Sequence, residues 1–187
     1  MDPSSNAKAA ARELARTWGA KPKVFRHWDK PELHHIDVAS CNDTPVEGCV
    51  GVGTVGLSDH DLGLGQVRIE LVGAFPRSFI AAPNIAATCA FNAFKDGVQT
   101  RPDSIHVNVI SLYRSTGVPH VLLTDPFLWA DGPQTLDDSA LKIAWLMMVP
   151  VSESERRFAY ENGVAALTDL FEQRQIDIFN LDREAVA

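Results

Sequence analysis

Histidines and aspartates that could bind a metal ion gather in two neighbouring stretches of the sequence. They are His34, His35, Asp37, His60 and Asp61. Imidazole and carboxylate groups suit zinc or iron, but adjacent strand residues point to opposite faces, so only His35 can share a face with Asp37. No glutamate or cysteine stands at a spacing that completes a site. We therefore predict no metal, and expect His35 and Asp37 to hydrogen-bond each other or the turn at Ser58 and Asp59.

A glycine pattern between these stretches could bind a nucleotide. Residues Gly51 to Gly56 match G-x-G-x-x-G, which holds a pyrophosphate when a strand precedes it and a helix starts inside it. The residues up to Gly65 are typical of a turn, and no βαβ unit follows. We predict a strand that enters a tight turn, and no cofactor. A metal-dependent enzyme using His35, Asp37 and His60, or a nucleotide-binding enzyme using residues 51–56, is the alternative function.

Other catalytic motifs are also missing from the sequence. It has no G-x-S-x-G and no P-loop, and Cys89 falls in a predicted helix with no evident base. The remaining cysteines, Cys41 and Cys49, form no C-x-x-C pair, which is typical of reduced thiols in a cytoplasmic protein. We predict that the chain is not an enzyme.

The most apolar stretch of the chain predicts a central strand. Residues Ile143 to Val149 carry no charge, and their number fits one buried strand and falls far short of a membrane span. Pro150 is expected to end this strand because proline cannot donate to a sheet ladder. Ser152 and Glu155 have the spacing of a capping box and predict the start of a helix.

The remaining elements follow from composition and periodicity. Helices are expected at 4–18 and 83–94, and the closing helix should break at 162–163. Strands are expected at 23–28, 34–39, 49–55, 66–72, 105–110 and 119–123, with a short one at 176–179. The alternation of apolar and polar residues along 66–72 predicts a strand with one solvent-exposed face, which includes Glu70. Together they predict an α+β fold with a mainly antiparallel or mixed sheet flanked by helices.

The length and composition of the chain predict one globular domain over residues 1–187. Hydrophobic residues make up 45% and charged residues 22% of the chain, and the net charge is -7. This acidity excludes nucleic acid as a natural partner, and no apolar stretch is long enough for a membrane. Residues 1–32 nevertheless carry seven basic and four acidic side chains. The favoured interpretation is a solvated basic helix; the alternative is that the acidic remainder faces a basic partner.

The order of these elements resembles the suppressor of fused (SUFU) family. The stretches AWLMMVPVSESERRFAYENGVAALTDLFEQRQ, VGTVGLSDHDL and HHIDVA are similar to its strand-Pro-helix segment, its Thr-x-Gly-x-Ser turn and its His-x-Asp strand. The matching positions are His35, Asp37, Thr54, Gly56, Ser58, Trp145, Pro150 and Glu155. The resemblance extends from about residue 30 to 175. SCNDTPVEGC is shorter and more polar than the family pattern, and 61–65 is peculiar to this chain.

The resemblance implies protein binding without catalysis. Bacterial members of the family are regarded as immunity proteins of polymorphic toxin systems, and animal members hold an extended peptide of a transcription factor. We place the chain on the bacterial branch and expect a protein partner, such as a basic toxin domain.

Charge and expected exposure predict where such a partner would bind. Loop carboxylates could face a basic active site, and an exposed aromatic residue could anchor the contact. The carboxylates are Asp59, Asp61, Asp131, Asp137 and Asp138. The anchor is Trp129, in a loop beside Phe127 and Leu128.

Overall fold

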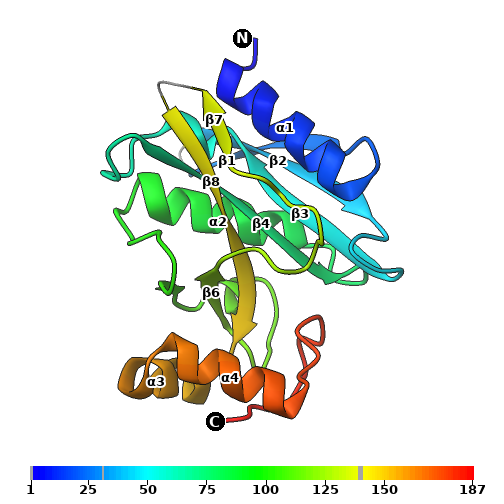
Figure 1. Ribbon diagram of the computed structural model, residues 1–187, viewed down its shortest axis with the longest axis vertical. Coiled ribbons are helices and arrows are strands. Elements are labelled where there is room, and N and C mark those ends of the chain that lie inside the picture. Colours follow the sequence, from blue (N-terminus) through cyan, green and yellow to red (C-terminus); the bar gives the residue numbers. More distant parts are fainter. Residues whose placement is uncertain (1, 31, 139–140) are drawn as a thin grey trace.

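A computed structural model describes residues 2–30, 32–138 and 141–187, which form one mixed sheet covered by helices (Figure 1). The strands are β1 (Lys23–Trp28), β2 (His35–Asn42), β3 (Cys49–Val55), β4 (Val67–Pro76), β5 (Ile105–His106), β6 (His120–Thr124), β7 (Leu136–Asp138) and β8 (Leu141–Val151). The helices are α1 (Ser5–Trp18), α2 (Ala82–Phe94), α3 (Glu153–Asn162) and α4 (Val164–Arg174), with single 3-10 turns η1 (Leu57–Asp59) and η2 (Ile110–Leu112).

The strand order is β1-β2-β3-β4-β8-β6-β5, with β7 paired to β8. β4 and β8 run parallel, and every other pair in the described residues is antiparallel. The parallel pair needs a long crossover, and α2 lies within it. This arrangement confirms the predicted α+β fold with its mainly antiparallel, mixed sheet.

Helices bury both faces of the sheet. Side chains of α2 pack into one hydrophobic cluster with Leu71 and Phe75 of β4. Side chains of α1 and α4 pack into the other with Trp145 and Met147 of β8. In Figure 1, α1 lies near the N-terminal end of the molecule, whereas α3 and α4 lie at the opposite end beside the C-terminus. No helix in the described ranges is both long and apolar enough to cross a bilayer.

Several local predictions are confirmed. The Ser4 hydroxyl accepts the Ala7 N–H at the start of α1. At the start of α3, Ser152 and Glu155 form the complete capping box. Gly163, with φ of 90°, separates α3 from α4 as expected.

Three predictions about strands are wrong. β8 continues through Pro150 to Val151, because β4 stops pairing at Met148 and the missing N–H costs no ladder bond there. The strand expected at 105–110 ends at His106 and gives way to η2. Residues 176–179 are irregular with a turn at 178–179, and their apolar pattern reflects half-buried packing of Ile176, Ile178 and Phe179 against the α1–α4 cluster.

Candidate functional site

A buried carboxylate organises the turn after β3. Glu70 of β4 is fully buried, so the predicted wet face is wrong at this position. The hydroxyls of Thr54 and Ser58 donate to it at 2.5 and 2.7 Å. The backbone N–H groups of Gly56, Leu57 and Ser58 donate at 2.8, 3.3 and 3.1 Å. The Thr-x-Gly-x-Ser pattern is therefore a cradle for the Glu70 side chain.

Burial raises the pKa of Glu70, and the hydrogen bonds from Thr54 and Ser58 oppose that rise. The Thr54 hydroxyl also accepts the Leu71 N–H at 2.8 Å, so its own hydrogen is free to point at the carboxylate. With five donors on two oxygens, Glu70 has no free lone pair directed at solvent. Its role is to hold the turn.

A second buried carboxylate fixes the C-terminal segment. Glu155 is fully buried and accepts both terminal nitrogens of Arg183 at 2.5 and 2.8 Å. Arg183 also donates to the Pro150 carbonyl at 3.0 Å and lies over the Phe171 ring. Burial alone would raise the pKa of Glu155, but the bonds from Arg183 and Ser152 outweigh it and the pKa is lowered. The ion pair ties residues 181–186 to the start of α3.

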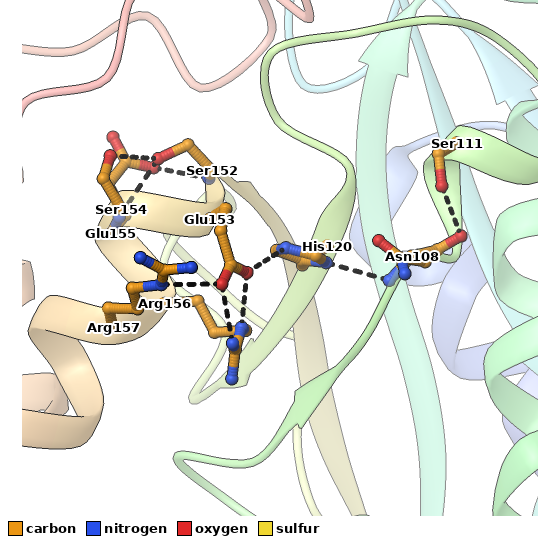
Figure 2. Close-up of polar contacts among 9 residues, drawn as sticks. All are labelled: Asn108, Ser111, His120, Ser152, Glu153, Ser154, Glu155, Arg156 and Arg157. Carbon is orange, nitrogen blue, oxygen red and sulfur yellow. Dashed lines mark hydrogen bonds and ion pairs between the residues drawn. The ribbon is translucent and has the colours of Figure 1, made fainter.

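A histidine–glutamate pair lies beside this segment (Figure 2). His120 of β6 is 3% exposed; its Nδ1 accepts the Asn108 N–H at 2.8 Å, so Nε2 carries the hydrogen and donates to Glu153 at 3.0 Å. Arg156 and Arg157 donate to the same carboxylate and hold the pKa of Glu153 well below its usual range. Burial lowers the pKa of His120. Both ring nitrogens of His120 form hydrogen bonds within the chain. The ring therefore cannot accept a proton from a substrate unless its hydrogen bond with the Asn108 N–H breaks.

The histidines predicted as metal candidates are separated into different contacts. The His35 ring lies tilted against Trp28 at 5.0 Å between ring centroids, and His60 stacks on Phe94 at 3.9 Å. Asp37 accepts both guanidinium nitrogens of Arg26 at 2.9 and 3.1 Å. The expected His35–Asp37 bond is wrong, because the cross-strand arginine takes the carboxylate. No group of three His, Cys, Asp or Glu residues in the described ranges could hold a metal.

The glycines predicted as a nucleotide candidate serve packing instead. Gly51 and Gly53 lie inside β3, and Gly56, with φ of 109°, begins the turn onto Glu70. A Cβ at Gly51 would lie 2.7 Å from the Thr44 methyl, and one at Gly53 would lie 2.8 Å from Leu14 of α1. The predicted strand that enters a tight turn is confirmed, and the two glycines let Trp18 and Leu14 of α1 pack closely on β3.

The predicted aromatic anchor is buried. Trp129 is 9% exposed, lies 6.5 Å from Trp18 between ring centroids, and donates its indole N–H to Thr44 at 3.1 Å. It closes the core between α1 and the sheet, which corrects its predicted place on the surface. Phe127, two residues earlier, is the exposed aromatic side chain of this loop at 59%. Trp145, placed in the family motif, is likewise buried and donates to the Gln134 carbonyl.

Two of the predicted acidic residues lie at opposite ends of α1. Asp59 accepts the Ser4 hydroxyl at the first turn, and the Asp131 carbonyl accepts Arg16 in the last turn, about 18 Å along the helix. Asp61 and Asp137 are exposed but lie beside Arg68 and Lys142. The backbone of Asp138 pairs with Leu141 at the end of β7. Asp59 and Asp131 therefore lie at opposite ends of α1.

An apolar cleft of about 630 Å³ opens between α4 and the segment that follows β6. We call it the α4 cleft. Its apolar lining includes Leu122, Phe127, Val149, Val164, Phe171 and Ile176. Asp103, Asp125 and Glu172 are exposed at its rim, and no lysine or arginine is among its described lining residues. A pocket of this composition suits an apolar group carried by a positively charged segment.

Comparison with known proteins assigns the family. The model for suppressor of fused protein (SUFU) matches residues 32–184. The immunity protein YqcF of Bacillus subtilis (strain 168) is 38% identical over 184 residues, which cover 96% of each chain. The chain belongs to the suppressor of fused family. The predicted membership, on the branch with bacterial immunity proteins, is confirmed.

Crystal structures of SUFU proteins share the fold. A SUFU homologue from Neisseria gonorrhoeae superposes with a TM-score of 0.72 at 13% identity, over 97% of both chains. A chain of the Sufu–Fu complex gives 0.70 at 17% identity, over 99% of this chain and 93% of that one. Drosophila Suppressor of Fused gives 0.68 at 14% identity, over 98% of this chain and 52% of its own.

Sequence reasoning missed the most informative polar residues of this SUFU chain. The alternation along 66–72 places Glu70 on the solvent side, although the Thr-x-Gly-x-Ser turn that binds it is visible in the sequence. His120 and Arg183 carried no motif, because their partners lie 33 and 28 residues away. For the α4 cleft, the usable signal was Phe127 in a loop rich in Asp and Pro.

Proposed function

We propose that this SUFU-family chain is a non-catalytic immunity-type protein, which binds a partner toxin in the cytoplasm and neutralises it. The observation that carries the proposal is the 38% identity to the immunity protein YqcF, which extends over 96% of both chains. The geometry of the buried polar groups supports it, because Glu70, His120 and Glu155 are each occupied by partners within the chain.

The α4 cleft is the proposed contact surface. Phe127 takes the role that the sequence suggested for Trp129, since it is exposed and lines an apolar cavity. The carboxylates of Asp103, Asp125 and Glu172 would face a basic flank of the partner segment.

The acidic loops keep a supporting role in this proposal. Their charges would draw a basic toxin domain toward the chain without forming one continuous contact. The residues concerned are Asp59, Asp61, Asp131, Asp137 and Asp138.

A growth assay tests the proposal. The tagged chain is used to capture its partner from the native host, and the captured protein is expressed alone in a bacterial strain. We expect it to arrest growth, and we expect co-expression of the chain to restore growth. Phe127→Glu should lose the rescue, because it places a charge in the apolar cleft.

Tyr160→Glu is the matched control, since Tyr160 is 89% exposed on α3 and outside the cleft. It should rescue as well as the natural chain. A captured partner that leaves growth unchanged when expressed alone would overturn the neutralising role. Full rescue by Phe127→Glu would overturn the assignment of the cleft while leaving the role in place.

A further inference from the structure

The outer strand of the sheet, β1, is open along its free edge. Among the described residues it pairs with β2 alone, and it stands at the end of the strand order. α1 packs mainly on β3, and α2 packs on β2, β3 and β4, so the main contacts of both helices in the described residues lie away from β1. Five of its six residues are exposed. An exposed edge strand of this kind is a ready template for pairing with another chain.

The pattern of backbone hydrogen bonds between β1 and β2 shows which residues of β1 direct their N–H and C=O groups toward the open edge. The Asp29 N–H donates to the His34 carbonyl at 3.0 Å, which makes this pair a hydrogen-bonded one. Because such pairs alternate along an antiparallel ladder, residues 23, 25 and 27 turn their N–H and C=O groups toward β2. Val24, Arg26 and Trp28 therefore present theirs to the open edge.

The side chains of this edge are unusually apolar for a surface strand. Val24, Phe25 and Trp28 are 47, 52 and 50% exposed. The other three tryptophans of the chain, Trp18, Trp129 and Trp145, are each below 10%. Val24 and Trp28 lie on one face of β1 and Phe25 on the other, so apolar groups line both faces beside the charged side chains of Lys23 and Arg26.

The charge around β1 is opposite to that of the whole chain. Lys21, Lys23 and Lys30 are exposed and form no ion pair within the described residues, in a protein of net charge -7. Arg26 is balanced by Asp37, and the nearby Asp29 is already paired with Lys95. Antiparallel pairing with a second copy would bring two such sets of lysines together, which disfavours it.

We propose that the free edge of β1 is a second protein-binding surface, which adds to the sheet an extended segment of a partner protein that alternates carboxylate and apolar side chains. Backbone bonds to Val24, Arg26 and Trp28 would supply affinity. Lys23 would face the carboxylates on one side of the added strand, and Val24 and Trp28 would cover its apolar groups on the other side. This surface is separate from the α4 cleft and stands whether or not the partner is a toxin.

A labelled peptide of about nine residues that alternates glutamate and valine is the probe, with a lysine–valine peptide as its counterpart. Fluorescence anisotropy with the full chain should show binding of the acidic peptide that weakens as salt rises from about 50 to about 300 mM. The lysine peptide should bind at least about tenfold more weakly. Trp28 emission should shift to the blue on binding, because Trp28 is the exposed tryptophan.

Two variants with matched controls locate the site. Val24→Pro removes an outward N–H while keeping the β1–β2 ladder, and should weaken binding by about tenfold with the melting temperature nearly unchanged. Lys21→Glu with Lys23→Glu should weaken it similarly. Lys8→Glu with Arg12→Glu, an equal change of charge on the exposed side of α1, should have a smaller effect.

Three results would overturn the proposal. The first is no binding of the acidic peptide by the folded chain. The second is equal binding of both peptides, which would mean that the strand edge binds extended peptides without selecting for charge. The third is a dimer in light scattering that Val24→Pro disperses, which would make a second copy the natural occupant of the edge.

Discussion

Five hydrogen bonds from the end of β3 and the turn that follows it converge on the carboxylate of Glu70. A buried carboxylate is costly unless it is well bonded, and here three of the donors are backbone N–H groups that have no other partner in the turn. The side chain therefore joins β4 to η1 and sets the direction in which the chain leaves β3. Glu70 therefore has a structural role, which is to fix the turn between β3 and β4.

Glu70→Gln should destabilise the fold by about 2–4 kcal/mol, because one amide NH₂ would face donors and leave buried groups unsatisfied. The free energy of unfolding in urea measures the loss. Glu47→Gln, a change at an exposed position, should stay within about 0.5 kcal/mol. Equal stability of the two variants would show that the cradle does not depend on an ionised carboxylate.

Histidine burial makes stability fall in acid. His106 is fully buried, and burial lowers its pKa from 6.5 to about 4. The unfolded chain therefore binds a proton below pH 6.5 that the folded chain binds only near pH 4, so stability is lost as pH falls through this window. His27, His60 and His120 shift in the same direction.

From pH 7.5 to pH 5, His106 alone should remove about 2 kcal/mol of unfolding free energy. Urea denaturation at the two pH values measures the total change, and His106→Gln should reduce that change by the same amount. A pH dependence that is unaltered in the variant would contradict the assigned pKa.

At the scale of elements, the C-terminal segment depends on one buried ion pair. Arg183→Met should cost about 3–5 kcal/mol, because it leaves Glu155 buried without its partner. Arg157→Met is the control, since Arg157 pairs with Glu153 on the same helical turn but is 70% exposed. It should cost less than about 1 kcal/mol. Similar costs for both would mean that the segment after α4 is not held by this pair.

The contact of α1 with the sheet depends on Gly53. Gly53→Ala should cost about 1–3 kcal/mol, because the new methyl would lie 2.8 Å from Leu14 and 3.2 Å from the Leu71 carbonyl oxygen. Combining it with Leu14→Ala should cost less than the sum of the two single changes, since the second removes the clash. Gly117→Ala, with its nearest atom at 3.5 Å, should be nearly neutral. Strict additivity would contradict the packing role of Gly53.

The sequence predicted the elements whose signals are local and missed those decided by distant partners. The α3 capping box, the break at Gly163 and the strand over residues 49–55 follow from neighbours in the chain and are confirmed. The passage of β8 through Pro150 depends on where β4 stops pairing. The burial of Glu70 and Trp129 depends on a turn and a helix far away in sequence. The contact surface was predicted from charge and expected exposure, with Trp129 as its anchor, whereas the apolar cleft beside Phe127 could be found only from the fold.

At the scale of the whole molecule, the α4 cleft and the β1 edge each combine exposed apolar side chains with charged ones. The charge is negative at the cleft and positive at the edge. The α4 cleft combines Phe127 with three carboxylates, and the β1 edge combines Trp28 with three lysines. The two lie on opposite sides of the strand order, since β1 is one edge strand and β6 lies next to the other. A partner that bound at both would have to carry both charges.

Amide hydrogen exchange of the chain with and without its captured partner most directly tests the claim that the partner binds in the α4 cleft. The method locates the contact surface without any mutation. We predict slower amide exchange in residues 122–127 and 164–178, which form the α4 cleft, with little change along α2. Unchanged exchange in both cleft segments, together with protection elsewhere, would contradict the claim that this SUFU-family chain holds its protein partner in the α4 cleft.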